Sequence, residues 1–118
     1  MNRDREWVED IQEALLLIES YLSPDLPAFL VDRKTQDAVI RQFAVIGEAT
    51  KRLSQTVRER YDNIPWRKVA GLRDLVIHDY DGIDARILWK ITQEDFSELK
   101  KTIQQMLDDL AESPSRET

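Results

Sequence analysis

The stretch "AVIRQFAVIGEATKRLS", from Ala38 to Ser54, decides the fold of this chain. Apolar residues recur through it and beyond it at intervals of three or four, which is typical of a helical seam. The positions are Val39, Phe43, Ile46, Leu53 and Val57, with Thr50 filling one slot. Asp32 is a suitable N-cap, so the pattern predicts one long helix that ends at Tyr61.

Gly47 lies inside this predicted helix, beside the apolar Ile46. Glycine in a helix interior costs about 1 kcal/mol relative to alanine. We therefore expect another helix to approach closely at Gly47.

Helical patterns also occupy the rest of the chain. Apolar spacing predicts a first helix from Asp4 to Tyr21, which Pro24 and Pro27 terminate. A third helix is predicted from Pro65 to His78, because proline is well suited to a first turn.

The C-terminal third begins with a turn, "DYDGID", in which Asp84 can cap the segment that follows. The last helical stretch then runs towards Leu110 and is expected to kink or restart near Thr92, where Asp95 allows a capping box.

No strand-like alternation and no repeat occurs in the 118 residues. The predicted fold class is therefore all-α, an antiparallel bundle of four to five helices. We expect one domain over 1–112 and a disordered tail over 113–118. The long helical seam exceeds what a four-helix monomer of this size needs, so we expect a homodimer with the second or third helix at its interface.

The composition narrows the function. No apolar run approaches a membrane span and no apolar segment follows the N-terminal charges, so we expect a cytoplasmic protein without membrane contact. There is no cysteine, which excludes disulfides and thiolate metal sites. The net charge is −6, yet the segment from Arg41 to Arg73 holds eight basic residues against three acidic ones. This basic stretch can hold a polyanion locally, although a solvated helix face also accounts for it.

The stretch "GLRDLVIHDYDG" holds the only histidine of the chain, His78, with Arg73 five residues before it and Tyr80 two after it. Residues on a continuous helix turn by about 100° each, so Arg73 and His78 cannot share one face. Asp74 and His78 are spaced i,i+4 and do face each other, so the carboxylate can fix the imidazole tautomer. Cooperation between Arg73 and His78 requires a helix end near His78 or a second chain.

Plainer interpretations of these residues remain open. His78 fits a lone polar residue that the dipole stabilises at a helix C-terminus, and Tyr80 fits an aromatic residue in a turn. Glu48 has no role beyond a pairing with a basic residue across an interface.

The chain resembles the HEPN superfamily, and more narrowly the HepT toxins of the type VII toxin-antitoxin pairs. Three segments carry the resemblance and cover about half the chain. They are "AVIRQFAVIGEATKRLS", "IPWRKVAGLRDLVIHDYDGID" from Ile64 to Asp84, and "LW" at Leu88 and Trp89. The arginine, histidine and tyrosine of the HEPN ribonuclease motif match Arg73, His78 and Tyr80.

The resemblance implies a metal-independent RNA endonuclease without a cofactor, in which Arg73 and His78 act at a dimer interface. It further implies that an MntA-like nucleotidyltransferase antitoxin, using ATP and Mg²⁺, neutralises the toxin by adding AMP to Tyr80. The substrate is expected to be tRNA or mRNA. RNA supplies its own nucleophile, the 2′-hydroxyl, while imidazole suits proton transfer and guanidinium suits phosphate.

This chain departs from the pattern of many relatives, which have Asn after the arginine and an uncharged residue after the histidine. Here Asp74 and Asp79 hold these positions, and carboxylates near a phosphate site repel RNA. The main alternative is therefore a non-catalytic HEPN module that binds a nucleotidyltransferase or a nucleotide. A carboxylate-bridged metal bundle lacks a Glu-x-x-His pair, and a coiled-coil adaptor leaves the three motif residues unexplained.

Overall fold

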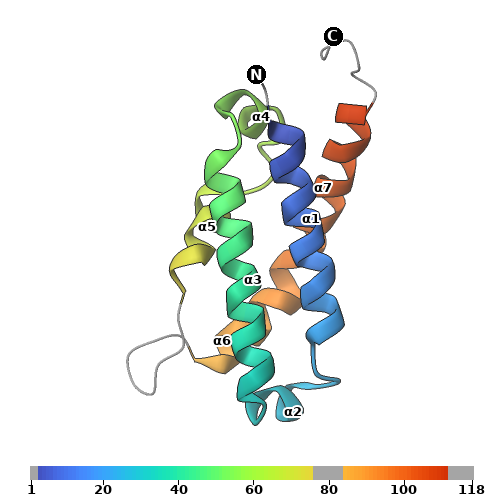
Figure 1. Cartoon of the computed structure of the whole chain (residues 1–118). Helices are drawn as coiled ribbons and strands as arrows, with labels where there is room; N and C mark the ends of the chain where they lie inside the picture. Colours follow the sequence, from blue (N-terminus) through green and yellow to red (C-terminus); the bar gives the residue numbers. More distant parts are fainter. Residues whose placement is uncertain (1–2, 76–83, 112–118) are drawn as a thin grey trace.

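The computed structural model describes residues 3–75 and 84–111, and every regular element within these ranges is a helix (Figure 1). This confirms the predicted all-α class. Three long helices form the bundle: α1 (Asp4–Tyr21), α3 (Arg33–Arg52) and α7 (Phe96–Ala111). In Figure 1, α3 and α7 both run antiparallel to α1, and the short α2 (Leu26–Leu30) lies at the turn between α1 and α3.

The helix α1 has the predicted bounds, and its apolar face is fully buried. Val8, Ile11 and Ile18 are at most 1% exposed, so the three- and four-residue spacing does place one face in the core. At the start of α3, the Asp32 carboxylate accepts a hydrogen bond from the backbone N–H of Thr35 at 3.0 Å. Asp32 is therefore the N-cap that the sequence predicts.

The second helix is not continuous to Tyr61 as predicted, because it breaks at Leu53 and Ser54. Both residues have extended backbone, and a separate helix α4 (Gln55–Arg60) follows. The buried carboxylate of Asp4 stabilises the break: it accepts hydrogen bonds from the Ser54 N–H at 2.8 Å and from the Ser54 hydroxyl at 2.7 Å. The same hydroxyl accepts from the N–H of Val57 at 3.2 Å and so caps α4. The apolar spacing continues through the break, so the sequence pattern could not reveal that this polar contact interrupts the helix.

The apolar seam of the predicted long helix is buried within a single chain. Its positions are all at most 8% exposed: Val39, Phe43, Ile46, Thr50, Leu53 and Val57. The long seam therefore does not by itself require a second chain, and the expected homodimer needs other support.

A polar contact joins α4 to α7. The Tyr61 hydroxyl, directly after α4, donates a hydrogen bond to the carboxylate of Asp109. Burial, together with this hydrogen bond to a carboxylate, raises the pKa of Tyr61 to about 12. The pKa of Asp109 is lowered in return, mainly by the hydrogen bond from Tyr61. At neutral pH the contact is therefore a neutral phenol bound to an ionised carboxylate.

The third helix is shorter than predicted. It consists of α5 (Trp66–Ala70) and a 3₁₀ turn, η1 (Gly71–Asp74), and the extended backbone of Leu75 ends it. Because Leu75 is extended, one helix does not join Asp74 to His78, and the shared helix face inferred for these two residues is wrong. The predicted helix end at His78 is also wrong, because the helical backbone stops at Asp74.

The last helical stretch begins at α6 (Ala85–Lys90), which Asp84 caps as predicted by accepting a hydrogen bond from the Arg86 N–H at 2.8 Å. A π-helical turn, η2 (Ile91–Asp95), separates it from α7 and confirms the irregularity expected near Thr92. The capping box does not form, because the Thr92 hydroxyl donates back to the carbonyl of Trp89 at 2.7 Å. None of the helices in the described ranges is long and apolar enough to cross a membrane.

Replacing Ser54 by alanine tests the break between α3 and α4. The change removes the cap of α4 and one donor to the buried Asp4 carboxylate, so Ser54→Ala should lower the unfolding free energy by about 2 kcal/mol. Urea denaturation measures the change. Ser20→Ala is the control, because the exposed Ser20 hydroxyl bonds only to the Leu17 carbonyl in its own helix, and it should change stability by less than about 0.5 kcal/mol. Equal midpoints for both variants would contradict the role given to Ser54.

Candidate active site

The centre of the candidate site is a backbone contact between α3 and η1 at Gly47. A Cβ atom at Gly47 would lie 2.6 Å from the Arg73 backbone nitrogen, 2.7 Å from the Ala70 carbonyl oxygen and 2.7 Å from the Arg73 Cβ. These distances are shorter than van der Waals contact, so only glycine permits η1 to pack here. The close helix approach predicted at Gly47 is confirmed, and it fixes the backbone of Arg73.

The next residue on α3, Glu48, holds the Arg73 side chain. The Arg73 Nη1 atom donates a hydrogen bond to Glu48 Oε1 at 2.6 Å, which is short for a nitrogen–oxygen pair and typical of a charge-assisted bond. The Arg73 side chain remains 38% exposed and that of Glu48 45% exposed. The guanidinium is therefore oriented and still open to a ligand.

The second oxygen of Glu48 binds another cation of the same helix. Arg52 Nε donates to Glu48 Oε2 at 3.1 Å. This hydrogen bond lowers the pKa of Glu48 most, and the positive charge of Arg73 lowers it further. The carboxylate between the two arginines is consequently ionised at neutral pH. The pairing with a basic residue that was expected across an interface is made inside one chain.

Asp74 forms a longer ion pair with the same guanidinium. Its Oδ1 atom is 3.6 Å from Arg73 Nε, which is beyond hydrogen-bond distance. Its side chain is 79% exposed. Asp74 thus places a second negative charge next to Arg73 without a hydrogen bond to it.

His78 and Tyr80 lie outside the described residues, so the structure places only two of the four predicted site residues. It brings Arg73 and Asp74 together on η1, next to Glu48. Sequence spacing gave Glu48 no assigned role; the available signal was its position directly after Gly47, the one glycine of the predicted seam.

Two of the cavities in the described part of the chain lie against α1, and one of these two reaches this cluster. A shallow groove of about 350 Å³ between α1 and α3 ends at Glu48. Its lining residues are Trp7, Asp10, Arg41, Ala44, Val45, Glu48 and Ala49. Trp7 also contacts the guanidinium of Arg52, which lies 5.4 Å from the ring centroid. The groove therefore connects the N-terminal helix to the surroundings of Arg73.

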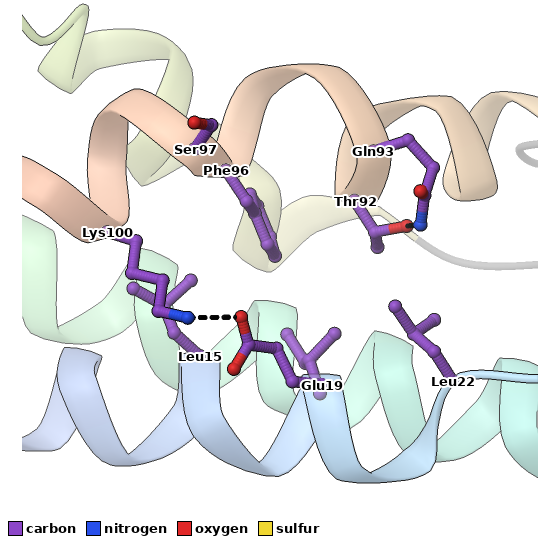
Figure 2. Close-up of a pocket in the computed structure, with 9 residues that line it drawn as sticks. Leu15, Glu19, Leu22, Thr92, Gln93, Phe96, Ser97 and Lys100 are labelled. Atoms are coloured by element: carbon purple, nitrogen blue, oxygen red, sulfur yellow. Dashed lines mark hydrogen bonds and ion pairs between the residues drawn. The ribbon is translucent and has the colours of Figure 1, made fainter.

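The other cavity, of about 320 Å³, lies between α1 and the junction of η2 with α7 (Figure 2). In Figure 2, Thr92, Gln93 and Phe96 line one wall and α1 forms the other, where Glu19 is paired with Lys100 at 2.6 Å. Of the predicted site residues that the structure describes, neither Arg73 nor Asp74 lines this cavity. In the part of the chain that the structure describes, no group of three or more carboxylate or imidazole ligands is placed to bind a metal ion.

The described chain is an all-α bundle, and it places Arg73, the arginine of this motif, on η1 shortly before the extended backbone of Leu75. This arrangement defines an HEPN-like helical domain. A family model described as "Ribonuclease HepT-like" matches residues 11–106 of the chain. The chain belongs to the HepT-like ribonuclease family.

Curated relatives agree with this assignment. "Probable ribonuclease HepT" of Thermococcus cleftensis is 44% identical over 97 residues, which span 81% of this chain and 88% of the relative. A "Putative RNase" of Caldanaerobacter subterraneus subsp. tengcongensis is 35% identical over 108 residues, 91% of this chain and 96% of the relative. A "Putative RNase" of Methanocaldococcus jannaschii is 37% identical over 94 residues, 80% of this chain and 86% of the relative. No solved structure matches the chain significantly.

Gly47→Ala tests the contact that positions Arg73. The added Cβ meets backbone atoms that have to move, which costs about 1–3 kcal/mol, and better helix propensity offsets about 1 kcal/mol. We expect a net loss of stability by urea denaturation.

Gly71→Ala is the matched control for this change. A Cβ at Gly71 would meet nothing within 4 Å, and the residue has helical backbone angles. The control should be as stable as the wild type or slightly more stable. A wild-type midpoint for Gly47→Ala would mean that η1 does not pack on Gly47 as described.

Proposed function

We propose that this protein is the toxin of a toxin-antitoxin pair and cleaves RNA without a metal ion. The observation that carries the proposal is the Arg73 guanidinium, held by Glu48 and partly exposed, in a chain of the HepT-like ribonuclease family. In this proposal Arg73 and His78 are the catalytic residues, Asp74 supports them, and the site lies at the interface of a homodimer.

The proposed reaction is an internal transesterification. The 2′-hydroxyl of RNA attacks the adjacent phosphorus, the new O2′–P bond forms, and the bond from phosphorus to the 5′-oxygen breaks. A base takes the proton of the 2′-hydroxyl, and an acid gives a proton to the leaving 5′-oxygen. The products are a 2′,3′-cyclic phosphate end and a free 5′-hydroxyl end.

The residues of this chain fit these roles. Imidazole exchanges protons near neutral pH, so the His78 residues of two chains can serve as base and acid. Guanidinium makes bidentate contacts with phosphate oxygens, so Arg73 can stabilise the charge that develops on the phosphorane. Because η1 ends before Leu75, the argument that Arg73 and His78 lie on different faces of one continuous helix does not apply.

Support for the homodimer comes from the requirement for two proton-transfer groups in a chain with one histidine. An exposed apolar residue lies near Glu48, the ion-pair partner of Arg73: Val45 on α3 is 38% exposed and lines the groove that reaches Glu48. In this proposal two copies of the chain meet along this face.

Regulation is proposed to occur at Tyr80. An MntA-like nucleotidyltransferase antitoxin would transfer AMP from ATP to the phenol oxygen with release of pyrophosphate, using Mg²⁺. The added phosphate lies two residues beyond His78, where its negative charge can pair with Arg73 and exclude RNA. The partner supplies ATP and Mg²⁺, and this chain needs no cofactor of its own.

A second candidate function is a non-catalytic module that binds a nucleotidyltransferase or a nucleotide. The carboxylates of Glu48 and Asp74 beside Arg73 favour it, because they oppose the approach of an RNA phosphate. This module would leave RNA intact even at high protein concentration.

His78→Ala tests the ribonuclease. Wild-type protein should cut RNA in the presence of EDTA, leave DNA intact and produce 2′,3′-cyclic phosphate ends. His78→Ala should cut about 10²- to 10⁴-fold more slowly, because it lacks the proton-transfer group. Gel assays with end-group analysis measure both. Equal cleavage by the variant would remove His78 from the mechanism, and intact RNA with the wild type would favour the binding module.

Tyr80→Phe tests the modification. Incubation with the antitoxin, ATP and Mg²⁺ should add one adenylate to the wild type by intact-protein mass spectrometry and none to Tyr80→Phe. Tyr21→Phe removes a tyrosine at the far end of α1 and should be labelled like the wild type. Labelling of Tyr80→Phe at the wild-type level would place the modification on another residue.

A further inference from the structure

We infer that Glu48 is a positioning residue of the ribonuclease site, which fixes the Arg73 guanidinium with one edge held and one edge free for phosphate. The inference rests on the proposed function, because it assigns how Arg73 is prepared for the reaction. It is carried by the contacts of α3 with η1.

The first step concerns the atoms that Glu48 uses. A guanidinium has five N–H donors, and a phosphate is bound best by two parallel bonds from one edge. Glu48 takes the Nη1 atom of Arg73. Among the residues that the structure describes, neither Nε nor Nη2 of Arg73 donates a hydrogen bond within normal distance. The Nε–Nη2 edge is therefore the edge left for a bidentate phosphate contact, in which the phosphate replaces the exposed Asp74 carboxylate 3.6 Å from Nε.

The second step concerns rigidity. Gly47 fixes the Arg73 backbone against α3, and Glu48 is the adjacent residue on that rigid helix. Arg52 holds the other carboxylate oxygen and so restricts the rotation of Glu48. Both ends of the Arg73 side chain are thus tied to one helix. A transition-state contact needs this precision, because a displacement of about 1 Å can reduce a rate about 100-fold.

The third step separates positioning from stability. An ion pair whose side chains are 38% and 45% exposed contributes little to folding, because solvent screens it. The short contact therefore adds little to the stability of the fold. We therefore assign the Glu48–Arg73 pair a role in orienting the guanidinium rather than in stabilising the fold.

The test compares Glu48→Ala, Glu48→Gln and a charge control in RNA cleavage. Glu48→Ala should lower kcat about 10- to 100-fold and leave KM within about threefold, because the lost contact acts on the transition state. Glu48→Gln should recover most of kcat, since its amide oxygen can still accept from Nη1. The urea midpoints of both variants should stay close to that of the wild type.

Glu59→Ala is the matched control. It removes the same charge from the same basic stretch, and Glu59 bonds to Gln55 on its own helix at 2.8 Å. Its kcat should equal that of the wild type. A decrease as large as that of Glu48→Ala would assign the effect to net charge and overturn the inference.

A measurement independent of activity follows the guanidinium itself. In NMR spectra, the Nη–H signals of Arg73 should be separate in the wild type, because pairing slows rotation about the Cζ–Nε bond, and should merge in Glu48→Ala. Arg73→Lys identifies the signals by their loss. Unchanged signals in Glu48→Ala would overturn the inference.

The kinetic outcomes also distinguish the two proposals. Wild-type cleavage with full or increased kcat in Glu48→Ala removes the positioning role and leaves the ribonuclease in place; an increase would make Glu48 a competitor of the phosphate. Absence of cleavage by the wild type removes the ribonuclease together with the role of Glu48.

Discussion

The close contact between α3 and η1 at Gly47 is the constraint on which the described site depends. A backbone nitrogen and a carbonyl oxygen lie where any other residue would place its Cβ. Glycine lowers the helix propensity of α3 by about 1 kcal/mol, and it allows a short 3₁₀ turn to pack directly against the helix backbone. This packing fixes the backbone of Arg73, and the hydrogen bond to Glu48 fixes its guanidinium as well.

The surroundings of Arg73 combine a partly exposed positive charge with two nearby negative charges. The carboxylates of Glu48 and Asp74 both lie near the guanidinium, but they differ in how firmly they are held. Glu48 is bound by two arginines, whereas Asp74 is 79% exposed and beyond hydrogen-bond distance. A phosphate that approaches Arg73 can therefore replace the exposed carboxylate of Asp74 without disturbing the pair that orients the arginine.

The sequence was informative where apolar periodicity or capping chemistry acts locally. The bounds of α1, the caps at Asp32 and Asp84 and the close approach at Gly47 all followed from such signals. Periodicity could not reveal the break at Ser54, because the apolar spacing continues through it while a carboxylate 50 residues away stabilises it. The early end of the third helix was missed as well, because apolar residues continue past Leu75 in the sequence and outweighed the turn-forming Gly71 and Asp74. The Glu48–Arg73 pair required knowledge of which helices touch, so only the three-dimensional arrangement could assign it.

The hydrogen bonds from Ser54 to Asp4 also bear on how the chain folds during synthesis. Asp4 is 3% exposed and its two bonds span 50 residues, so the N-terminal end of α1 cannot complete its contacts until Ser54 has left the ribosome. The bond from Tyr61 to Asp109 spans another 48 residues, so it forms only after α7 has been made. The start of α1 is thus secured before α4 is joined to α7. The bundle acquires this topology only when α7 has been released.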